Sequence, residues 1–280
     1  GVQARETIEL GDFARTRDLS PLAAAIRRMC AAANGAPVLG VCIGFPANLD
    51  PDAAAIVSYA AMDIQQPTSF AQVFPAFWRE VELPVYLEND ANLACEGEAF
   101  LRRGAGGAAN MLYLSIGSGC GGAVRLDGKL RRGARCRAGE VGAMLLQPAL
   151  GAPGRSAARE TLEDAVCLAA LERRFGAALR DGAQPGEASA QAMRDYLCGP
   201  LSGAVYSLVM TLDVELCVLA GIVPGALGMQ LCTQVSEALR AALPESTPVR
   251  VEPSVSADAG VIGAAATVFE RSLDALLGSG

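Results

Sequence analysis

Three short segments between Leu87 and Gly142 hold the residues best suited to chemistry. They are LENDAN at 87–92, SIGSGCGG at 115–122 and AGEVG at 138–142. A carboxylate can act as a general base, and a glycine-rich turn can bind phosphate oxygens through its backbone N–H groups. A second carboxylate can accept hydrogen bonds from hydroxyls. In this order the segments predict phosphoryl transfer to a sugar hydroxyl.

The first segment places a carboxylate at the end of a predicted strand. The strand runs from Pro84 to Glu88, and a predicted helix follows it from Ala91 to Arg103. Asp90 lies at this junction, where its carboxylate could take the proton of an attacking hydroxyl. Asn89 can both donate and accept, which suits sugar hydroxyls. The alternative is that Asn89-Asp90 only caps the helix.

The second segment is a glycine-rich turn between two predicted strands, Met111 to Gly117 and Ala123 to Leu126. Glycine lets the backbone approach a ligand closely, and Ser118 adds a further donor. The alternative is a hairpin or bulge whose glycines are needed for positive φ. The turn matches neither the Walker pattern nor the dinucleotide fingerprint.

Two further carboxylates follow the glycine turn. Glu140 lies between Gly139 and Gly142, where little side-chain bulk would crowd a ligand, and Glu163 opens a predicted helix. Placement of Glu163 there is also explained by the favourable electrostatics of an acidic residue at a helix N-terminus.

The chain contains no histidine. This excludes a Ser-His-Asp triad, a Cys-His protease, an H-E-x-x-H zinc site and a histidine general base. Acid and base chemistry near neutral pH must therefore fall mainly to carboxylates.

The overall composition predicts a globular protein. Of the 280 residues, 51% are hydrophobic and 19% are charged, with a net charge of −7. The negative charge argues against binding nucleic acid through the whole surface. The sequence has no long uncharged apolar run of the kind that predicts a membrane span. Nine cysteines without a C-x-x-C pair favour reduced thiols in the cytoplasm.

Strands alternate with helices along the chain, which predicts an α/β fold with sites at the carboxyl ends of strands. Asp127-Gly128 predicts a tight hairpin turn. The further expected strands are 2–10, 37–46, 215–221 and 249–255, and the further expected helices are 20–33, 69–81, 160–179, 188–212, 226–242 and 258–277. The Pro-, Gly- and Ala-rich stretch from Pro148 to Arg159 predicts an exposed loop.

In this order the motifs resemble those of the ROK family of repressors, open reading frames and sugar kinases. Family members carry an E-N-D-A-N-like motif, a glycine-rich phosphate loop, A-G-E-x-G-H and a segment ending in C-L-E. The resemblance covers most of the chain and extends to Leu162-Glu163, to 212–221 and to 258–265. Gly44-Phe45-Pro46-Ala47 is similar to the variant form of allose kinases, and the chain as a whole is nearest to allose or glucose kinases.

The resemblance implies an actin-like ATPase fold, related to ribonuclease H, with two lobes and a central cleft. The expected lobes are 1–96 with the C-terminal helix 264–280, and 97–263. It implies that Asp90 is the catalytic base and that Asn89, Glu140 and Glu163 hold sugar hydroxyls. It also implies that ATP, with Mg²⁺, meets Gly117, Ser118, Gly119, Gly121 and Gly221, and that the protein forms a homodimer.

Three departures from the family pattern bear on this prediction. The opening D-x-G-G-T phosphate strand is absent, so the first lobe is expected to lack its N-terminal strands. The histidine expected after Gly142 is Ala143, and the cysteine cluster is replaced by the stretch 148–159. Structural zinc is therefore not expected.

Three hypotheses follow. The first is ATP-dependent phosphorylation of a hexose or hexose-like sugar, with Asp90 as the base. The second is the sugar-sensing domain of a ROK-type repressor that lacks its DNA-binding part, and the third is a degenerate, non-catalytic relative. In each case the expected partner is a small-molecule sugar, with no membrane and no direct nucleic-acid contact from this chain. The motifs do not name the sugar.

Overall fold

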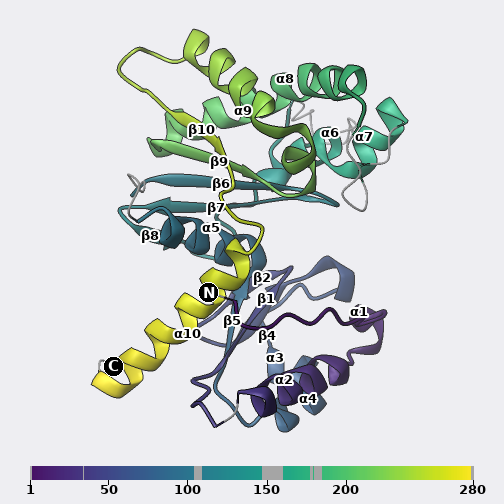
Figure 1. Ribbon diagram of the computed structural model, residues 1–280, viewed down its shortest axis with the longest axis vertical. Coiled ribbons are helices and arrows are strands. Elements are labelled where there is room, and N and C mark those ends of the chain that lie inside the picture. The colour runs from purple at the N-terminus through teal and green to yellow at the C-terminus, as the bar shows by residue number, and fades with distance from the viewer. Residues whose placement is uncertain are drawn as a thin grey trace. The chain divides into compact units, whose positions relative to one another are not determined.

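The computed structural model describes residues 2–33, 35–103, 109–146, 160–176, 179 and 185–278. The chain forms two compact units, and Figure 1 labels their elements. Unit 1 comprises Gly1–Phe100, Gly133–Arg137 and Asp258–Gly280, and unit 2 comprises Leu101–Arg132 and Ala138–Ala257. Both are α/β, as predicted, and the loop predicted at 148–159 lies outside the described residues.

A pair of parallel strands forms the centre of unit 1. β1 (Val41–Phe45) pairs with β5 (Val85–Asn89), and Gly44 lies opposite Glu88. Helix α5 (Asp90–Leu101) follows β5 without an intervening loop, so Asp90 stands at the carboxyl end of the strand, as predicted.

Short elements surround this pair. They are α1 (Phe13–Thr16), α2 (Ser20–Ala32), β2 (Asn48–Asp50), β3 (Ala55–Ser58), η1 (Ala60–Met62), β4 (Thr68–Ser69), α3 (Phe70–Val73) and α4 (Pro75–Glu80). β2, β3 and β4 form a small antiparallel sheet that the sequence did not indicate. The helix predicted over 69–81 is two helices, because Phe74 leaves the helical conformation ahead of Pro75.

The strand predicted from Val2 to Leu10 is wrong. These residues have no regular structure and are mostly exposed, with only Ile8 and Leu10 partly covered. An extended segment becomes a strand only when its backbone groups pair with a neighbour, and no such neighbour exists here among the described residues.

The last helix, α10 (Ala259–Leu277), belongs to unit 1 although it is distant in sequence from the rest of that unit. A Cβ atom on Gly97 of α5 would overlap the Ala259 backbone, and one on Gly263 of α10 would overlap the Leu93 backbone. The two helices therefore approach closely at glycine positions.

Unit 2 is built on a five-stranded sheet of order β10-β9-β6-β7-β8. The strands are β6 (Met111–Ile116), β7 (Cys120–Leu126), β8 (Lys129–Arg131), β9 (Leu216–Ala220) and β10 (Arg250–Pro253). β10, β9 and β6 run parallel, and β7 and β8 are antiparallel to their neighbours. The predicted β7–β8 hairpin is confirmed: Asp127 and Gly128 both have positive φ, as a two-residue turn of this kind needs.

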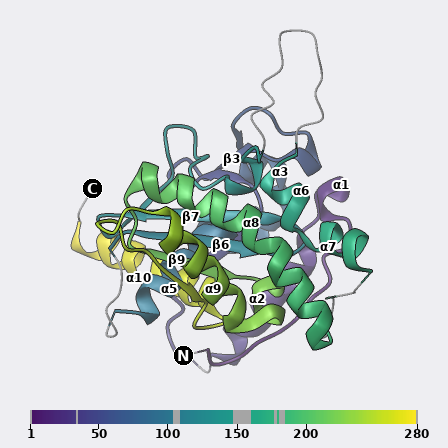
Figure 2. The same ribbon diagram turned by 90° about the horizontal axis from the view of Figure 1, so that it is seen from above.

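Helices pack on one another and on the sheet of unit 2. They are α6 (Leu162–Val166), α7 (Leu168–Phe175), α8 (Glu187–Leu212) and α9 (Ile222–Ala242), with the one-turn helix η2 (Val141–Ala143) beside β7. Figure 2 shows α8 and α9 crossing over β6, β7 and β9. The helix predicted over 160–179 divides at Cys167, which has an extended backbone.

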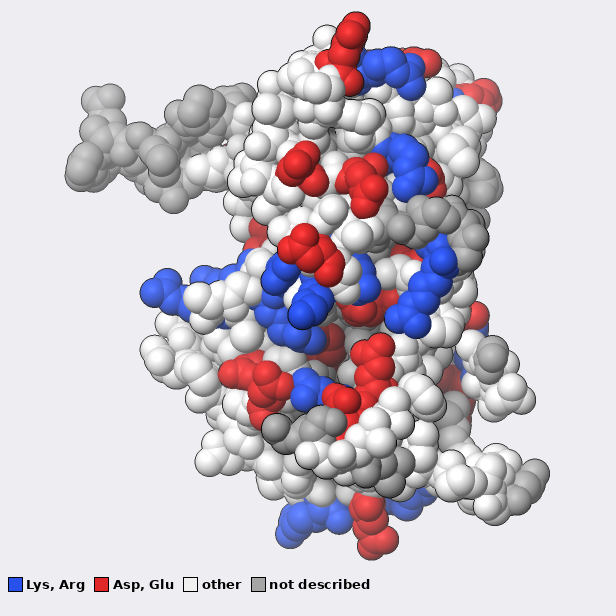
Figure 3. Space-filling view, turned by 90° about the vertical axis from the view of Figure 1, so that its left-hand side faces the viewer, with Lys and Arg blue, Asp and Glu red and all other residues white. Residues whose placement is uncertain are grey.

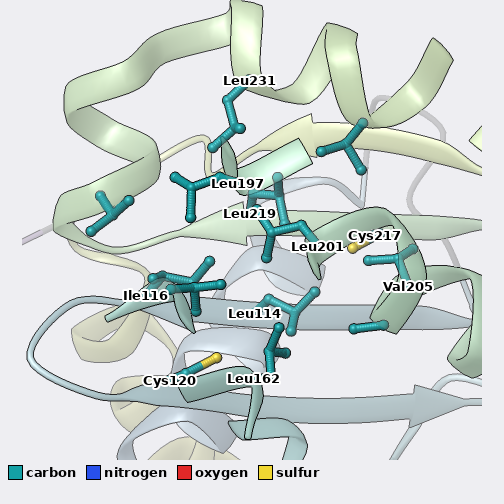
Figure 4. Close-up of a cluster of buried hydrophobic side chains, with 14 of the residues drawn as sticks. Leu114, Ile116, Cys120, Leu162, Leu197, Leu201, Val205, Cys217, Leu219 and Leu231 are labelled. Carbon is teal, nitrogen blue, oxygen red and sulfur yellow. The ribbon is translucent and has the colours of Figure 1, made fainter. Parts of the chain in front are cut away.

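The buried core of unit 2 lies between these helices and the sheet. Leu114 and Ile116 of β6 and Leu219 of β9 point toward Leu197 and Leu201 of α8, as Figure 4 shows. Burying such side chains stabilises a fold by roughly 1.5–3 kcal/mol each. This core fixes the ends of β6 and β9.

The surface carries charges of both signs. On the face drawn in Figure 3, acidic and basic side chains are interspersed. Among the helices that the structure describes, none combines the length and apolar character that crossing a bilayer requires.

Candidate functional site

In unit 1 the candidate base lies at the junction of β5 and α5. Asp90 is exposed, and its Oδ1 accepts a hydrogen bond from the Ala91 N–H at 2.9 Å. Asn89 caps the helix, because its Oδ1 accepts from the N–H groups of Ala91 (3.0 Å) and Asn92 (3.2 Å). Its Nδ2 donates to the Ala47 carbonyl at 3.2 Å. The capping role of Asn89 is therefore present, and it holds Asp90 at the first position of α5.

A buried carboxylate lies behind this junction. Glu88 is 3% exposed, and its Oε1 accepts from the Asn89 N–H (2.9 Å) and from the Asn92 side-chain amide (2.8 Å). It thus joins the end of β5 to the first turn of α5. Sequence reasoning gave Glu88 and Asn92 no role, because Glu88 lies in a strand and Asn92 in the helix that follows it, so no helical spacing pairs them.

Two side chains near the junction of β5 and α5 have raised pKa values. Burial and the nearby Glu88 raise the pKa of the Cys42 thiol to about 12. Burial and the charge of Asp90 raise the pKa of Tyr59. The Tyr59 ring packs against Phe45, whose backbone lies opposite Asn89 in the β1–β5 pair. Tyr59 therefore lies close to Asp90, and sequence reasoning gave no sign of it.

In unit 2 the glycine turn connects β6 to β7. Ile116 pairs with Cys120, and within the turn the Gly117 N–H donates to the Gly119 carbonyl at 2.9 Å. None of the glycines of this turn has positive φ. The alternative in which these glycines serve positive φ is therefore wrong. Gly119 and Gly122 have close neighbours where a side chain would lie, whereas a Cβ on Gly117 would meet nothing within 4 Å.

Gly122 and Gly139 bring the segment of Glu140 against β7. A Cβ on Gly122 would lie 2.9 Å from the Gly139 carbonyl oxygen and 2.7 Å from Cγ2 of Val141. Gly139 has φ +95°, a conformation that favours glycine. Glu140 is exposed at the start of η2. The packing of its neighbours Gly139 and Val141 against β7 fixes the position of its backbone.

Glu163 contacts the glycine turn directly. It lies in the first turn of α6, and its Oε2 accepts from the Cys120 N–H at 2.8 Å. A Cβ on Gly119 would lie 2.9 Å from the same oxygen. Burial, Glu163 and Cys167 raise the pKa of the Cys120 thiol to about 12.

Gly221 lies beside the end of β6. It has φ +93° and precedes α9, and a Cβ there would overlap the Ile116 backbone. The start of α9 is thereby brought next to the glycine turn, with its first N–H groups unpaired within the helix. The helical conformation of α9 is interrupted at Gly228 (φ +69°, ψ −165°), so a short helical segment follows Gly221.

The backbone around the turn suits phosphate oxygens. Within the described part of the chain, the N–H groups of Ser118 and Gly119 have no hydrogen-bond partner, and Ser118 is exposed. Together with the unpaired N–H groups at the start of α9 they offer hydrogen-bond donors to an anion. The residues present therefore fit a nucleotide phosphate. Groups of three or more Cys, Asp and Glu that could hold a metal do not occur within the described ranges.

The structure places the predicted residues in two groups. Asn89 and Asp90 lie together in unit 1. In unit 2, Glu163 lies against Gly119, and Gly221 lies beside the strand that leads to Gly117.

These features define an α/β protein with an acidic residue at a strand end and a glycine turn beside the start of a helix. The chain belongs to the ROK family, whose model matches residues 12–271. Its fold is the actin-like ATPase fold of that family's sugar kinases.

The proteins that this chain is similar to include kinases and a repressor. The chain is 34% identical over 141 residues to a glucokinase of Halalkalibacterium halodurans, covering 48% of this chain and 40% of the glucokinase. It is 33% identical over 105 residues to a xylose repressor of Caldicellulosiruptor bescii, covering 38% of this chain and 25% of the repressor. A crystal structure of a ROK hexokinase from Thermus thermophilus is similar, with a TM-score of 0.68 and 27% identity over 91% of this chain and 86% of that one. The chain spans less than half the length of the curated relatives it matches.

Proposed function

We propose that this chain carries out ATP-dependent phosphorylation of a hexose or hexose-like sugar. The observation that carries the proposal is Asp90, an exposed carboxylate fixed at the carboxyl end of β5 by the Asn89 cap and the buried Glu88. Similarity to a glucokinase and to a ROK hexokinase supports the reaction class.

Asp90 would act as the general base. Its carboxylate would take the proton of the attacking sugar hydroxyl as that oxygen bonds to the transferring phosphorus. The contact that Asp90 makes with Ala91 uses one oxygen, Oδ1. Asn89 would contribute through the second hydrogen of Nδ2, because its Oδ1 is occupied by the cap.

The groups of unit 2 would hold the substrates. Glu140 and Glu163 would accept hydrogen bonds from sugar hydroxyls. ATP, bound with Mg²⁺, supplies the phosphoryl group. Its phosphates would be held by Gly117, Ser118, Gly119 and Gly121, with Gly221 near the nucleoside. Preorganised N–H donors of this kind stabilise the charge that develops during transfer.

Substitution of Asp90 tests the base. We expect Asp90→Asn to lower kcat by about 10²–10⁴-fold while the sugar Kd stays within a few-fold, because the amide keeps the shape but cannot take a proton. ADP release across a panel of hexoses measures the first quantity, and calorimetry measures the second. Asp63→Asn, an exposed aspartate of the same unit, is the control. Unchanged turnover in Asp90→Asn would rule out this role.

A second function has an observation of its own. The position of the family's histidine is Ala143, and part of the chain is similar to a xylose repressor. A sugar-sensing domain would bind a hexose without releasing ADP under any nucleotide condition. Sugar binding by the wild-type chain with no turnover across the whole panel would favour this function over the kinase.

A further inference from the structure

The segment that contains α6 holds the glycine turn at two points. At one point, Glu163 Oε2 accepts from the Cys120 N–H at 2.8 Å. At the other, the Leu168 N–H donates to the Gly117 carbonyl at 2.8 Å. These two bonds lie on either side of Ser118 and Gly119, whose N–H groups have no partner in the described part of the chain.

The short helix that carries Glu163 is itself fixed. The Thr161 side chain accepts from the Asp164 N–H, and the Asp164 carboxylate accepts from the Thr161 N–H. Leu162, which precedes Glu163, is fully buried in the core of unit 2. The backbone of Glu163 is therefore anchored on both sides of the residue.

The Glu163 carboxylate also lies close to the backbone of Gly119. A Cβ at position 119 would lie 2.9 Å from Glu163 Oε2 and 3.6 Å from its Cδ, closer than ordinary contact for the oxygen. Because φ at Gly119 is not positive, its backbone conformation does not require glycine. A Cβ there would instead displace the Glu163 carboxylate from its present position.

Only one oxygen of Glu163 serves this contact. Oε1 has no hydrogen bond within the described residues, and the residue as a whole is exposed. One oxygen therefore meets the turn while the other remains available to a ligand.

We propose that Glu163 is a positioning residue for the nucleotide: its Oε2 fixes the glycine turn in the conformation that binds phosphate, while Oε1 meets the sugar. The sugar contact rests on the proposed function, and the positioning of the turn does not. Through this side chain, occupation of the sugar site and the conformation of the phosphate turn are coupled.

Charge repulsion alone predicts the opposite effect of Glu163 removal on nucleotide affinity, so the two explanations can be distinguished. A carboxylate beside a phosphate site repels the nucleotide, so its removal would tighten binding if Glu163 did not shape the turn. If it does shape the turn, removal weakens binding. Glu163→Gln keeps an acceptor for the Cys120 N–H but loses the charge, and Glu163→Ala loses both.

The first experiment measures Mg²⁺–AMPPNP binding by calorimetry in the absence of sugar. We expect Glu163→Ala to weaken binding about 5- to 10-fold, corresponding to roughly 1–1.4 kcal/mol, with Glu163→Gln between it and the wild type. Glu160→Gln removes an exposed carboxylate three residues away and is the matched control. Unchanged or tighter binding by Glu163→Ala overturns the proposal.

A second variant approaches the same contact from the other side. Gly119→Ala should weaken AMPPNP binding like Glu163→Ala, and the double variant should be no weaker than the worse single one, because both changes break one contact. Gly199→Ala adds a methyl to an open face of α8 and is the control. Additive losses in the double variant would contradict a shared contact.

Hydrogen exchange separates this proposal from the proposed function. The Cys120 amide, followed in a peptide that covers 117–122, should exchange faster in Glu163→Ala than in the wild type, whether or not any hexose is phosphorylated. A wild-type chain that binds no sugar, together with this faster exchange, would refute the proposed function and keep the positioning role. Equal exchange rates would refute the positioning role.

Discussion

At the scale of single residues, the junction of β5 and α5 depends on a carboxylate that does not face solvent. Glu88 is buried and accepts two hydrogen bonds with the same oxygen. A buried acceptor of this kind is expensive to disturb, because each donor left without a partner loses its hydration as well as its bond. The exposed Asp90 thus rests on a network that the solvent does not reach.

Replacement of Glu88 should therefore affect stability. We expect Glu88→Gln to lower the free energy of unfolding by about 1–3 kcal/mol, because the added NH₂ group brings donors into a site built for an acceptor. Urea denaturation measures the change. Glu82→Gln, an exposed glutamate in the loop before β5, should stay within about 0.5 kcal/mol of the wild type. Equal stability of Glu88→Gln and the wild type would show that the network contributes little.

At the scale of elements, α6 shows how a very short helix is stabilised. Five residues are too few for a helix to be stable alone, so the capping box of Thr161 and Asp164 and the burial of Leu162 carry it. Hydrogen bonds from Thr161 lower the pKa of the Asp164 carboxyl. A group whose pKa is lower in the folded state stabilises the fold above its unfolded pKa, and this stabilisation is lost as the pH falls through the folded pKa.

The cap can be tested by removing the Thr161 hydroxyl. We expect Thr161→Ala to lower the free energy of unfolding at pH 7 by about 0.5–2 kcal/mol. The difference from the wild type should shrink as the pH is lowered, because protonated Asp164 no longer completes the box. Denaturation curves at several pH values measure this difference. A loss that stays constant down to pH 2 would show that the ionised carboxylate has no part in the cap.

At the scale of the whole molecule, unit 1 is assembled from segments far apart in the chain. α10 reaches α5 through Gly97 and Gly263, where any side chain would overlap the backbone of the other helix. The surface of α10 also exposes Val261 and Phe269, each more than half accessible. The division into lobes at 1–96 with 264–280 and at 97–263, and the homodimer, stay predictions.

A methyl group between the two helices should destabilise unit 1. We expect Gly263→Ala to lower its stability by about 1–3 kcal/mol, the usual range for overpacking. Gly260→Ala on the same helix adds a methyl that meets nothing within 4 Å and should be neutral or slightly stabilising. Hydrogen exchange read separately for peptides of the two units gives the measurement. Equal effects of the two substitutions would show that α10 does not pack closely on α5.

Local patterns in the sequence determined the turn between β7 and β8 and the position of the candidate base. Asp127-Gly128 forms a hairpin turn because its residues accept positive φ, and Asp90 falls at a strand end because apolar residues stop there and helix formers begin. Both features depend on interactions over a few residues. The order of the motifs was enough to indicate the ROK family.

Tertiary structure alone decided the contacts that join distant segments. Nothing near Gly119 indicates that Glu163, more than forty residues later, occupies the space left by its missing side chain. Likewise Val2 to Leu10 was predicted to be a strand, but no strand among the described residues pairs with it. Turn chemistry and periodicity act between neighbours in the chain, whereas close approach and strand pairing depend on where the rest of the chain is packed.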